Sequence, residues 1–381
     1  MGKRHSDMSL FFELIQISLG HRVAFSRSPS VAEWSALRRE AQRQALTGIL
    51  FAGIEGLPKM QRPPRETLLP WYVVAEKIKE INRGLNREVV RVVEKLERDG
   101  FPAVLLKGQG VAALYPDPLL RAPGDIDLWL GVSRTAIMRY ARRFAARPHT
   151  TYLHTVLPLS KMTEVEAHFT PSLAFSPLRN RRMQRLFATM APEQFAHRTE
   201  LPAGAGRICT PTPEFNRIYL LAHIYRHLFD EGIGLRQLLD YYYLLRQGVP
   251  GKDRGQSGKE SSDNGDSVEA VAVALKKLGL YRFAQAVMYV EQEVFGLEKE
   301  YLLAQPDVRT GRFLLSEIML AGNFGHYDPR LNRSSGDTRG RIFLRKVRRN
   351  WRFVRNYPGE VLCDPFFRLG HYIWRRWNGF L

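Results

Sequence analysis

The chain has 381 residues, a length that favours about two or three domains and allows a large buried core. Hydrophobic residues make up 44% and charged residues 25%, an ordinary globular composition that excludes a disordered or fibrous protein. Lysine and arginine number 57 against 38 aspartates and glutamates, and the formal net charge of +19 favours anionic partners such as nucleotides, nucleic acid or an acidic membrane surface.

Two cysteines occur and no CxxC pair, so a disulfide framework and a cysteine-rich zinc site are excluded. The apolar stretch near the N-terminus is interrupted by Glu13 and Gln16 and does not have the features of a signal peptide. No stretch has the roughly 18 consecutive apolar residues that are needed to cross a bilayer. We therefore expect a cytoplasmic protein that is soluble or at most peripheral to a membrane.

Residues 1–98 are expected to form an N-terminal helical segment, because their apolar residues recur at helical spacing. Residues 99–200 have a different pattern and are expected to form a small α/β core. Short apolar runs in this core predict strands at 103–106, 125–130, 152–158 and 162–169. A basic helix is expected at 133–146. This block is small for a complete domain, so we expect it to pack against its helical neighbours.

Residues 201–329 return to a helical pattern and predict a helical domain. Within it, residues 248–267 lack apolar anchors and are rich in Gly, Ser, Asp and Lys, which predicts a disordered loop. Residues 330–381 are basic and aromatic and are expected to form C-terminal helices. The predicted fold is therefore α+β, with a small mixed β-sheet embedded between helical N- and C-terminal segments.

Carboxylates alternate with apolar residues in the second and fourth predicted strands. Asp125 and Asp127 should project from one face of the sheet, because strand side chains alternate. Such a pair can hold a hard divalent cation. Glu166 and His168 project together from the later strand, so Glu166 could bring a third carboxylate to the same metal. Two aspartates at this spacing also arise by chance, and a solvated strand edge or a pair of loop caps is the alternative.

A glycine-containing turn precedes the aspartates. Gly108 and Gly110 would let the backbone approach a phosphate, and Lys107 adds a positive charge beside them. A tight turn after a buried strand is the alternative for this segment. Arg121 could contact a phosphate, or it could form a structural ion pair with Asp117 or Asp125.

The chain resembles the uncharacterised nucleotidyltransferases of the DNA polymerase beta superfamily. The resemblance rests on the run LLKGQGVAALYPDPLLRAPGDIDLWL at 105–130, and on the later carboxylate-x-His element Glu166-Ala167-His168. A histidine-containing helix and a following Arg…Asp helix extend it over roughly residues 30–245, through His223, His227, Arg236 and Asp240.

This resemblance implies a metal-dependent nucleotidyltransferase core that uses Mg²⁺ or Mn²⁺ and a nucleoside triphosphate such as ATP. It implies that three carboxylates bind the metals and act in catalysis, namely Asp125, Asp127 and Glu166. The implied nucleotide-binding residues are Lys107, Gly108, Gln109 and Arg121. The superfamily usually has Gly-Ser at the turn, so Gln109 stands where a serine would contact phosphate. The implied acceptor is a hydroxyl group on a sugar, as in polysaccharide biosynthesis, or on RNA or protein.

The histidines and the Arg…Asp pair also have simpler interpretations. His168 could position Glu166 or be a satisfied strand histidine. His223 and His227 lie four residues apart and are expected to pack between helices, with a contact to nucleotide or acceptor as the alternative. Arg236 and Asp240 are expected to form an intrahelical ion pair.

The C-terminal segment has thirteen basic residues against three acidic ones from Arg330 onward. Its apolar residues fall into two helical stripes: Phe343, Val347, Trp351 and Val354, then Phe366, Leu369, Ile373 and Trp377. These helices could pack on the protein's own core, lie on an anionic membrane surface, or contact RNA or DNA. The alternative to an enzyme is therefore a basic protein with a decayed active site, which binds nucleic acid or an anionic membrane.

Overall fold

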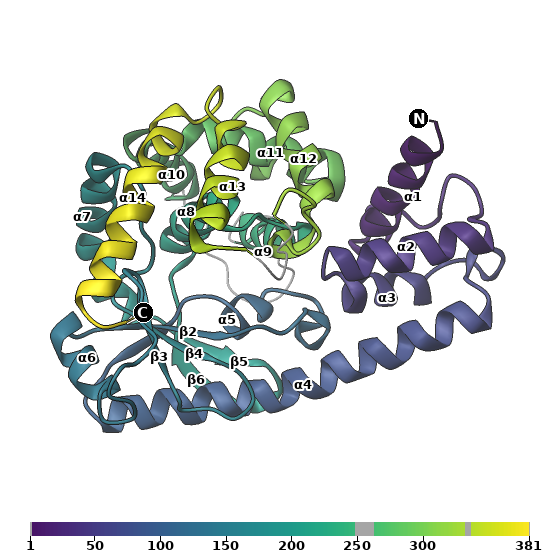
Figure 1. Cartoon of the computed structure of the whole chain (residues 1–381). Helices are drawn as coiled ribbons and strands as arrows, with labels where there is room; N and C mark the ends of the chain where they lie inside the picture. The colour runs from purple at the N-terminus through teal and green to yellow at the C-terminus, as the bar shows by residue number, and fades with distance from the viewer. Residues whose placement is uncertain (1, 248–262, 332–336, 381) are drawn as a thin grey trace.

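The structure is a computed structural model that describes residues 2–247, 263–331 and 337–380. In these residues a six-stranded mixed sheet is flanked by helices on both faces (Figure 1). The predicted α+β fold, with a small mixed sheet between helical N- and C-terminal segments, is confirmed. No helix in the described ranges is long and apolar enough to cross a membrane.

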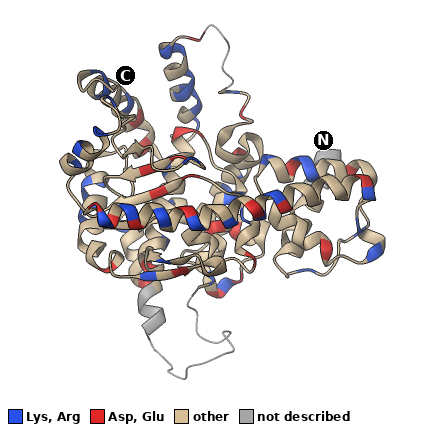
Figure 2. Ribbon diagram, turned by 90° about the horizontal axis from the view of Figure 1, so that it is seen from below, with Lys and Arg blue, Asp and Glu red and all other residues tan. Residues whose placement is uncertain are grey.

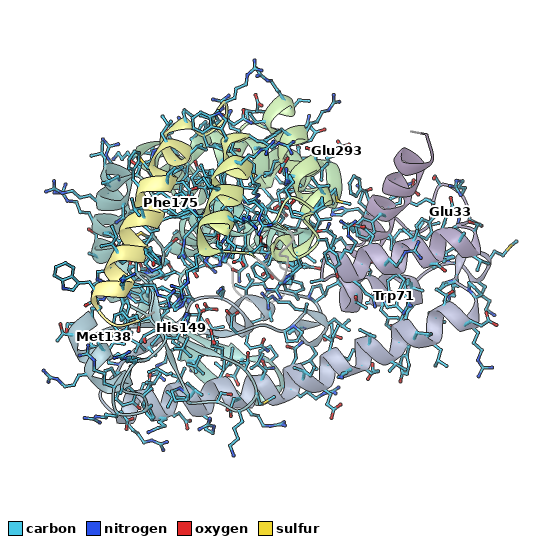
Figure 3. The ribbon with its side chains drawn as sticks, in the orientation of Figure 1. Glu33, Trp71, Met138, His149, Phe175 and Glu293 are labelled. Carbon is cyan, nitrogen blue, oxygen red and sulfur yellow. The ribbon has the colours of Figure 1, made fainter. Side chains whose placement is uncertain are left out.

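The N-terminal segment is helical, as predicted. It consists of α1 (Gly2–Ser18), α2 (Val31–Arg43), α3 (Thr47–Glu55), the short 3-10 helix η1 (Lys59–Gln61) and α4 (Arg65–Arg98). Trp71 joins α4 to the preceding helices (Figure 3): its indole Nε1 donates to the carbonyl of Thr47 at 2.8 Å, and Trp34 packs edge-on at 6.4 Å. The first half of α4 therefore belongs to the N-terminal helical layer.

The second half of α4 supports the sheet. Its buried residues Leu85, Val89 and Leu96 pack in one apolar cluster with Ile126 and Leu128 of the sheet. Basic and acidic residues alternate along this helix, which Figure 2 shows as blue and red segments of the long helix in front. A single amphipathic helix thus links the N-terminal helices to one face of the sheet.

The sheet has the strand order β3-β4-β2-β1-β6-β5. The strands are β1 (Ala103–Leu105), β2 (Ile126–Leu130), β3 (His154–Leu157), β4 (Val165–His168), β5 (Arg198–Leu201) and β6 (Gly206–Cys209). The pairs β2–β4 and β1–β6 are parallel, and the others are antiparallel. The four predicted strands are confirmed. Strands β5 and β6 were not predicted. The residues of β5 are polar and largely exposed, so they lack the apolar pattern of a strand.

Helices also cover the opposite face of the sheet, where α8 packs. The helices between the strands are α5 (Gln109–Ala112), η2 (Pro118–Leu120), α6 (Arg134–Ala141), α7 (Pro177–Gln194) and η3 (Pro202–Gly204), of which α6 packs in the same apolar cluster as α4. Those after the sheet are α8 (Pro213–Asp230), α9 (Leu235–Leu245), α10 (Asp263–Leu278), α11 (Tyr281–Phe295), η4 (Lys299–Tyr301), α12 (Val308–Ala321), η5 (Asn323–Gly325), α13 (Arg339–Trp351) and α14 (Pro358–Trp377). Trp129 of β2 stacks on Phe215 of α8 at 5.9 Å, which joins this helical layer to the sheet.

Two sequence predictions change in detail. The helix expected at 133–146 is shorter, at Arg134–Ala141. Of the loop expected at 248–267, residues 248–262 lie outside the described residues, and 263–267 belong to α10. The prediction of a loop is therefore wrong for these last five residues.

A buried ion pair joins the segment between α5 and β2, residues 113–125, to helix α9. Arg121 Nε and Nη2 donate to Asp240 Oδ1 and Oδ2 at 2.7 and 2.8 Å, and the Tyr115 hydroxyl donates to the same carboxylate at 2.6 Å. From the other side, Asn82 of α4 donates to the carbonyls of Leu119 and Arg121 at 2.7 Å. The expected intrahelical pair between Arg236 and Asp240 is wrong, because Asp240 pairs with Arg121.

We predict that Arg121→Ala lowers the free energy of unfolding by about 3–5 kcal/mol, because it leaves Asp240 as an uncompensated buried charge. Denaturant unfolding measures this change. Lys79→Ala is the matched control, since it breaks the half-exposed pair with Glu76 (3.2 Å) and should cost no more than about 1 kcal/mol. Equal losses for the two variants would contradict this role of Arg121.

Candidate metal and nucleotide site

Strand pairing brings three carboxylates together on the sheet face that is turned toward the helical layer. Asp127 and Glu166 are Cα partners in the parallel β2–β4 ladder, and Asp125 immediately precedes β2. One ligand oxygen from each lies within 4.8 Å of the other two. The structure therefore places together the three residues that the sequence analysis assigned to one metal site, although metal binding itself stays a prediction.

Lys107 follows β1 and approaches these carboxylates, with its Nζ 3.1 Å from Asp127 Oδ1. Burial alone would lower the pKa of the Lys107 ammonium, but the charges of Asp125 and Asp127 outweigh burial and raise this pKa, so Lys107 is a cation. In return, Lys107 lowers the pKa of Asp125, whereas burial raises the pKa of Asp127. The lysine thus offsets part of the repulsion in the cluster.

Two histidines hold Glu166 from neighbouring positions. His168 Nε2 lies 3.0 Å from Asp127 Oδ1 and 3.1 Å from Glu166 Oε2, and His154 Nδ1 lies 3.0 Å from the same Glu166 oxygen. Burial would raise the pKa of Glu166, but the hydrogen bond with His168 and the close approach of His154 lower it, so Glu166 is ionised. Of the two interpretations of His168, the geometry favours positioning of Glu166. His154 was not predicted as a site residue, because its only signal in the sequence was its place in a predicted strand.

The glycine-containing turn lies against the start of β2. Gly108 has a φ of +64°, and a Cβ built there would lie 3.4 Å from the carbonyl oxygen of Asp125. The turn leads into the single helical turn of α5, where the Gln109 side chain is buried and donates to Asn86 Oδ1 of α4 at 2.5 Å. The Gln109 amide nitrogen is thus engaged with α4, while Gly108 lies beside the carboxylates.

Arg121 differs from the expectation. Its side chain is 3% exposed and pairs with Asp240, and with neither Asp117 nor Asp125. Because Arg121 Nε and Nη2 both donate to the Asp240 carboxylate, the arrangement favours a structural role for Arg121 over a contact with phosphate.

Helices α8 and α9 add further side chains near the site; of these, only His223 had a contact to nucleotide or acceptor as an alternative from the sequence. The Tyr219 hydroxyl, His223 Nδ1 and Arg236 Nε are buried and have no hydrogen-bond partner among the described residues. The charge of Lys107 acts on Tyr219 and His223. At His223, burial and Lys107 both lower the pKa. At Tyr219, burial raises the pKa and Lys107 partly offsets this rise. These buried polar atoms are therefore candidates for a contact with a ligand.

Arg236 and His223 have identifiable surroundings. The Arg236 guanidinium donates to the carbonyls of Ala122 and Pro123, at 3.5 and 3.2 Å. The rings of His223 and His227 lie 4.3 Å apart in an edge-on contact, which agrees with the packing role expected for this pair. Sequence spacing alone could not place α8 and α9 beside the carboxylates.

The residues present fit a hard divalent cation. Asp127 Oδ2 is buried without a hydrogen-bond partner among the described residues, so the site contains an unsatisfied carboxylate oxygen beside two further carboxylates. Oxygen ligands of this kind suit Mg²⁺ or Mn²⁺.

Comparison with known proteins addresses what such a site does. Searches of curated proteins and of solved structures give no significant match. The family model described as "Uncharacterised nucleotidyltransferase" matches residues 30–296, more than two thirds of the chain. The matched segment includes the whole sheet and every residue of the carboxylate cluster, and it ends before α12. The chain therefore belongs to this family of uncharacterised nucleotidyltransferases.

Proposed function

We propose that this nucleotidyltransferase is metal-dependent and moves a nucleoside monophosphate from a nucleoside triphosphate, such as ATP, to a hydroxyl group of an acceptor. The observation that carries the metal dependence is the meeting of Asp125, Asp127 and Glu166 within 4.8 Å. A bond forms between the acceptor oxygen and the α-phosphorus, the bond from that phosphorus to the bridging oxygen breaks, pyrophosphate leaves, and the proton of the acceptor hydroxyl passes to solvent.

Asp125 and Asp127 hold Mg²⁺ or Mn²⁺ in this proposal, and Glu166 completes the ligand set. A divalent cation bound by these carboxylates would neutralise the negative charge that develops on the attacking and leaving oxygens. His154 and His168 keep Glu166 ionised and oriented, since both lie within about 3 Å of its Oε2. Their contribution is to positioning, because neither is proposed to touch the reacting atoms.

Lys107 is proposed to bind a phosphate of the donor. Its side chain is charged and largely buried, and it lies beside both aspartates. The Gly108 backbone approaches the same position. Tyr219, His223 and Arg236 contribute the free polar atoms that could contact the donor or the acceptor. The acceptor class stays open among sugar, RNA and protein.

The alternative of a decayed site in a basic binding protein rests on Gln109, which replaces the usual serine. The three carboxylates and the Lys107–Asp127 ion pair weigh against this alternative. Three carboxylates this close repel one another, and a bound divalent cation would relieve this repulsion.

Transfer of label from α-labelled and γ-labelled ATP tests the proposal, with the purified chain, Mg²⁺ or Mn²⁺, and a fractionated cell extract. We expect the α-label, and not the γ-label, to appear on a sugar, RNA or protein fraction. Transfer of the γ-label alone would instead indicate a phosphoryl transferase. No transfer, together with no nucleotide binding by calorimetry, would support the decayed site.

We predict that Asp125→Asn and Asp127→Asn each lower nucleotidyl transfer by at least roughly a hundredfold, because the metal loses a charged ligand. Circular dichroism and the melting temperature should show an intact fold. Glu193→Gln, which removes an exposed carboxylate on α7, is the control and should keep full activity. Full activity in either Asp variant would refute the assignment of the metal site.

Lys107→Met is predicted to change two affinities in opposite directions. Nucleotide affinity should fall by about tenfold, since a phosphate partner is lost, and Mn²⁺ affinity without nucleotide should rise, since a competing cation beside the aspartates is lost. Isothermal titration calorimetry measures both. Lys77→Met, an exposed change on α4, should alter neither affinity. A parallel loss of both affinities in Lys107→Met would contradict this role of Lys107.

A further inference from the structure

Helix α14 exposes a continuous apolar stripe. Its residues recur every three or four positions and have large exposed fractions: Leu362 51%, Phe366 78%, Leu369 53%, Ile373 51% and Trp377 88%. Packing of this stripe on the protein's own core was one of the sequence interpretations, and it is wrong for these residues. At 1.5 Å per residue the stripe is about 22 Å long, so it is a surface and not a scatter of single side chains.

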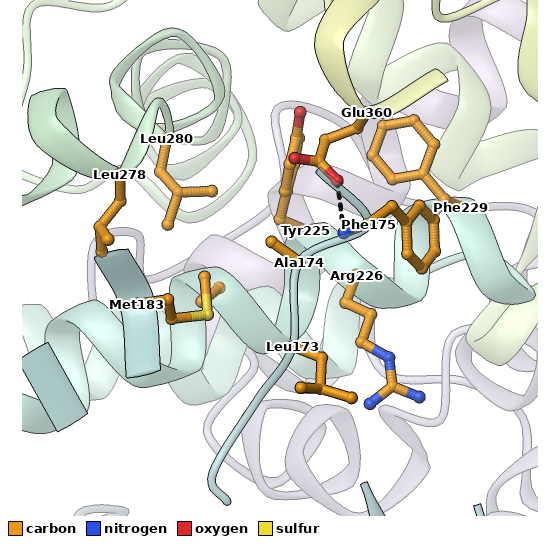
Figure 4. A pocket seen from close by; sticks show the side chains of 11 residues that line it. Leu173, Ala174, Phe175, Met183, Tyr225, Arg226, Phe229, Leu278, Leu280 and Glu360 are labelled. Atoms are coloured by element: carbon orange, nitrogen blue, oxygen red, sulfur yellow. Dashed lines mark hydrogen bonds between the residues drawn. The ribbon is translucent and has the colours of Figure 1, made fainter. Parts of the chain in front are cut away.

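The opposite face of α14 is anchored to the protein. Glu360 accepts a hydrogen bond from the Phe175 backbone at 2.8 Å (Figure 4), and buried Asp364 accepts one from Asn350 of α13 at 2.9 Å. Near the end of the helix, Trp374 packs on Tyr152 at 4.8 Å. Since these contacts fix the helix along its length, the stripe faces outward in the folded protein.

The exposed charges of the C-terminal segment 337–380 have one sign. Of the three acidic residues in 337–380, Glu360 and Asp364 are buried and Asp337 pairs with Arg345. The exposed charged residues of this segment are all arginines, namely Arg339, Arg341, Arg348, Arg352, Arg355 and Arg376, and of these Arg352 pairs with Glu317 at 3.1 Å.

Arginines also border the stripe directly. Arg376 and Arg339 lie near the hydroxyl of Tyr372, an exposed neighbour of Ile373, and lower the pKa of this hydroxyl. Arg339 begins α13, which lies beside α14 (Figure 1). Basic groups from both helices therefore flank the apolar residues.

We propose that the exposed face of α14, with the arginines of α13 and α14, binds the surface of an anionic lipid bilayer with the helix parallel to that surface. A helix with Trp, Phe, Leu and Ile on one side and arginines beside them suits this location, because the apolar side chains enter the acyl boundary and the guanidiniums contact lipid phosphates. Nucleic acid would use arginines and stacked aromatic rings but leaves three aliphatic residues without a partner. The inference does not depend on the proposed transfer reaction.

Co-sedimentation of the full chain with vesicles tests the proposal. The vesicles contain either equal parts of phosphatidylglycerol and phosphatidylcholine, or phosphatidylcholine alone. The test variant is Phe366→Ser/Trp377→Ser. The matched control is Val23→Ser/Met60→Ser, which removes two apolar side chains that are 85% and 92% exposed far from α14 in the sequence. Melting temperatures confirm that each variant is folded.

We expect the wild type and the control to bind the anionic vesicles at least tenfold more tightly than the phosphatidylcholine vesicles. The test variant should bind the anionic vesicles at least tenfold more weakly than the wild type. Absence of vesicle binding, or equal binding by the test variant and the wild type, would overturn the proposal. Binding of a single-stranded oligonucleotide without binding of vesicles would also overturn it. The proposal would likewise be overturned if light scattering showed the wild type to be a dimer and the test variant to be a monomer.

Discussion

Three carboxylates within 4.8 Å repel one another, and the surroundings of the site offset this repulsion. Lys107 approaches Asp127 from the end of β1, His168 of β4 contacts both Asp127 and Glu166, and His154 contacts Glu166 from β3. The contacts of Lys107 and His168 with Asp127, and of His154 with Glu166, join neighbouring strands, so the charge balance depends on the order β3-β4-β2-β1. A site assembled by strand pairing is held rigidly before any ligand binds, as electrostatic catalysis requires.

The helical segments complete this arrangement from two sides. Asn82 of α4 and Asp240 of α9 hold the segment that leads to Asp125, while Arg236 donates to the carbonyls just before Gly124. The helices are therefore part of the site and not a separate layer. By contrast, α13 and α14 lie beyond the family match, and their arginine-flanked apolar surface is independent of the carboxylate cluster.

The local features of the site could be predicted from sequence. The alternation around Asp125 and Asp127 and the glycine turn at Gly108 are short-range patterns that fix strand faces and a turn. The Arg121–Asp240 pair could not be predicted, because it joins residues 119 positions apart and depends on how α9 packs. His154 depends on the β3–β4 register, which places it opposite His168. Tyr219 is buried like an ordinary core residue, so its sequence gives no sign that it lies near the site.

Anomalous diffraction from crystals grown with Mn²⁺ and a non-hydrolysable ATP analogue tests the central claim most directly. The account predicts Mn²⁺ bound by oxygens of Asp125, Asp127 and Glu166, with the triphosphate on the same metal and Lys107 beside a phosphate oxygen. A nucleotide bound elsewhere, or Mn²⁺ absent from these three carboxylates while nucleotide is present, would contradict the account.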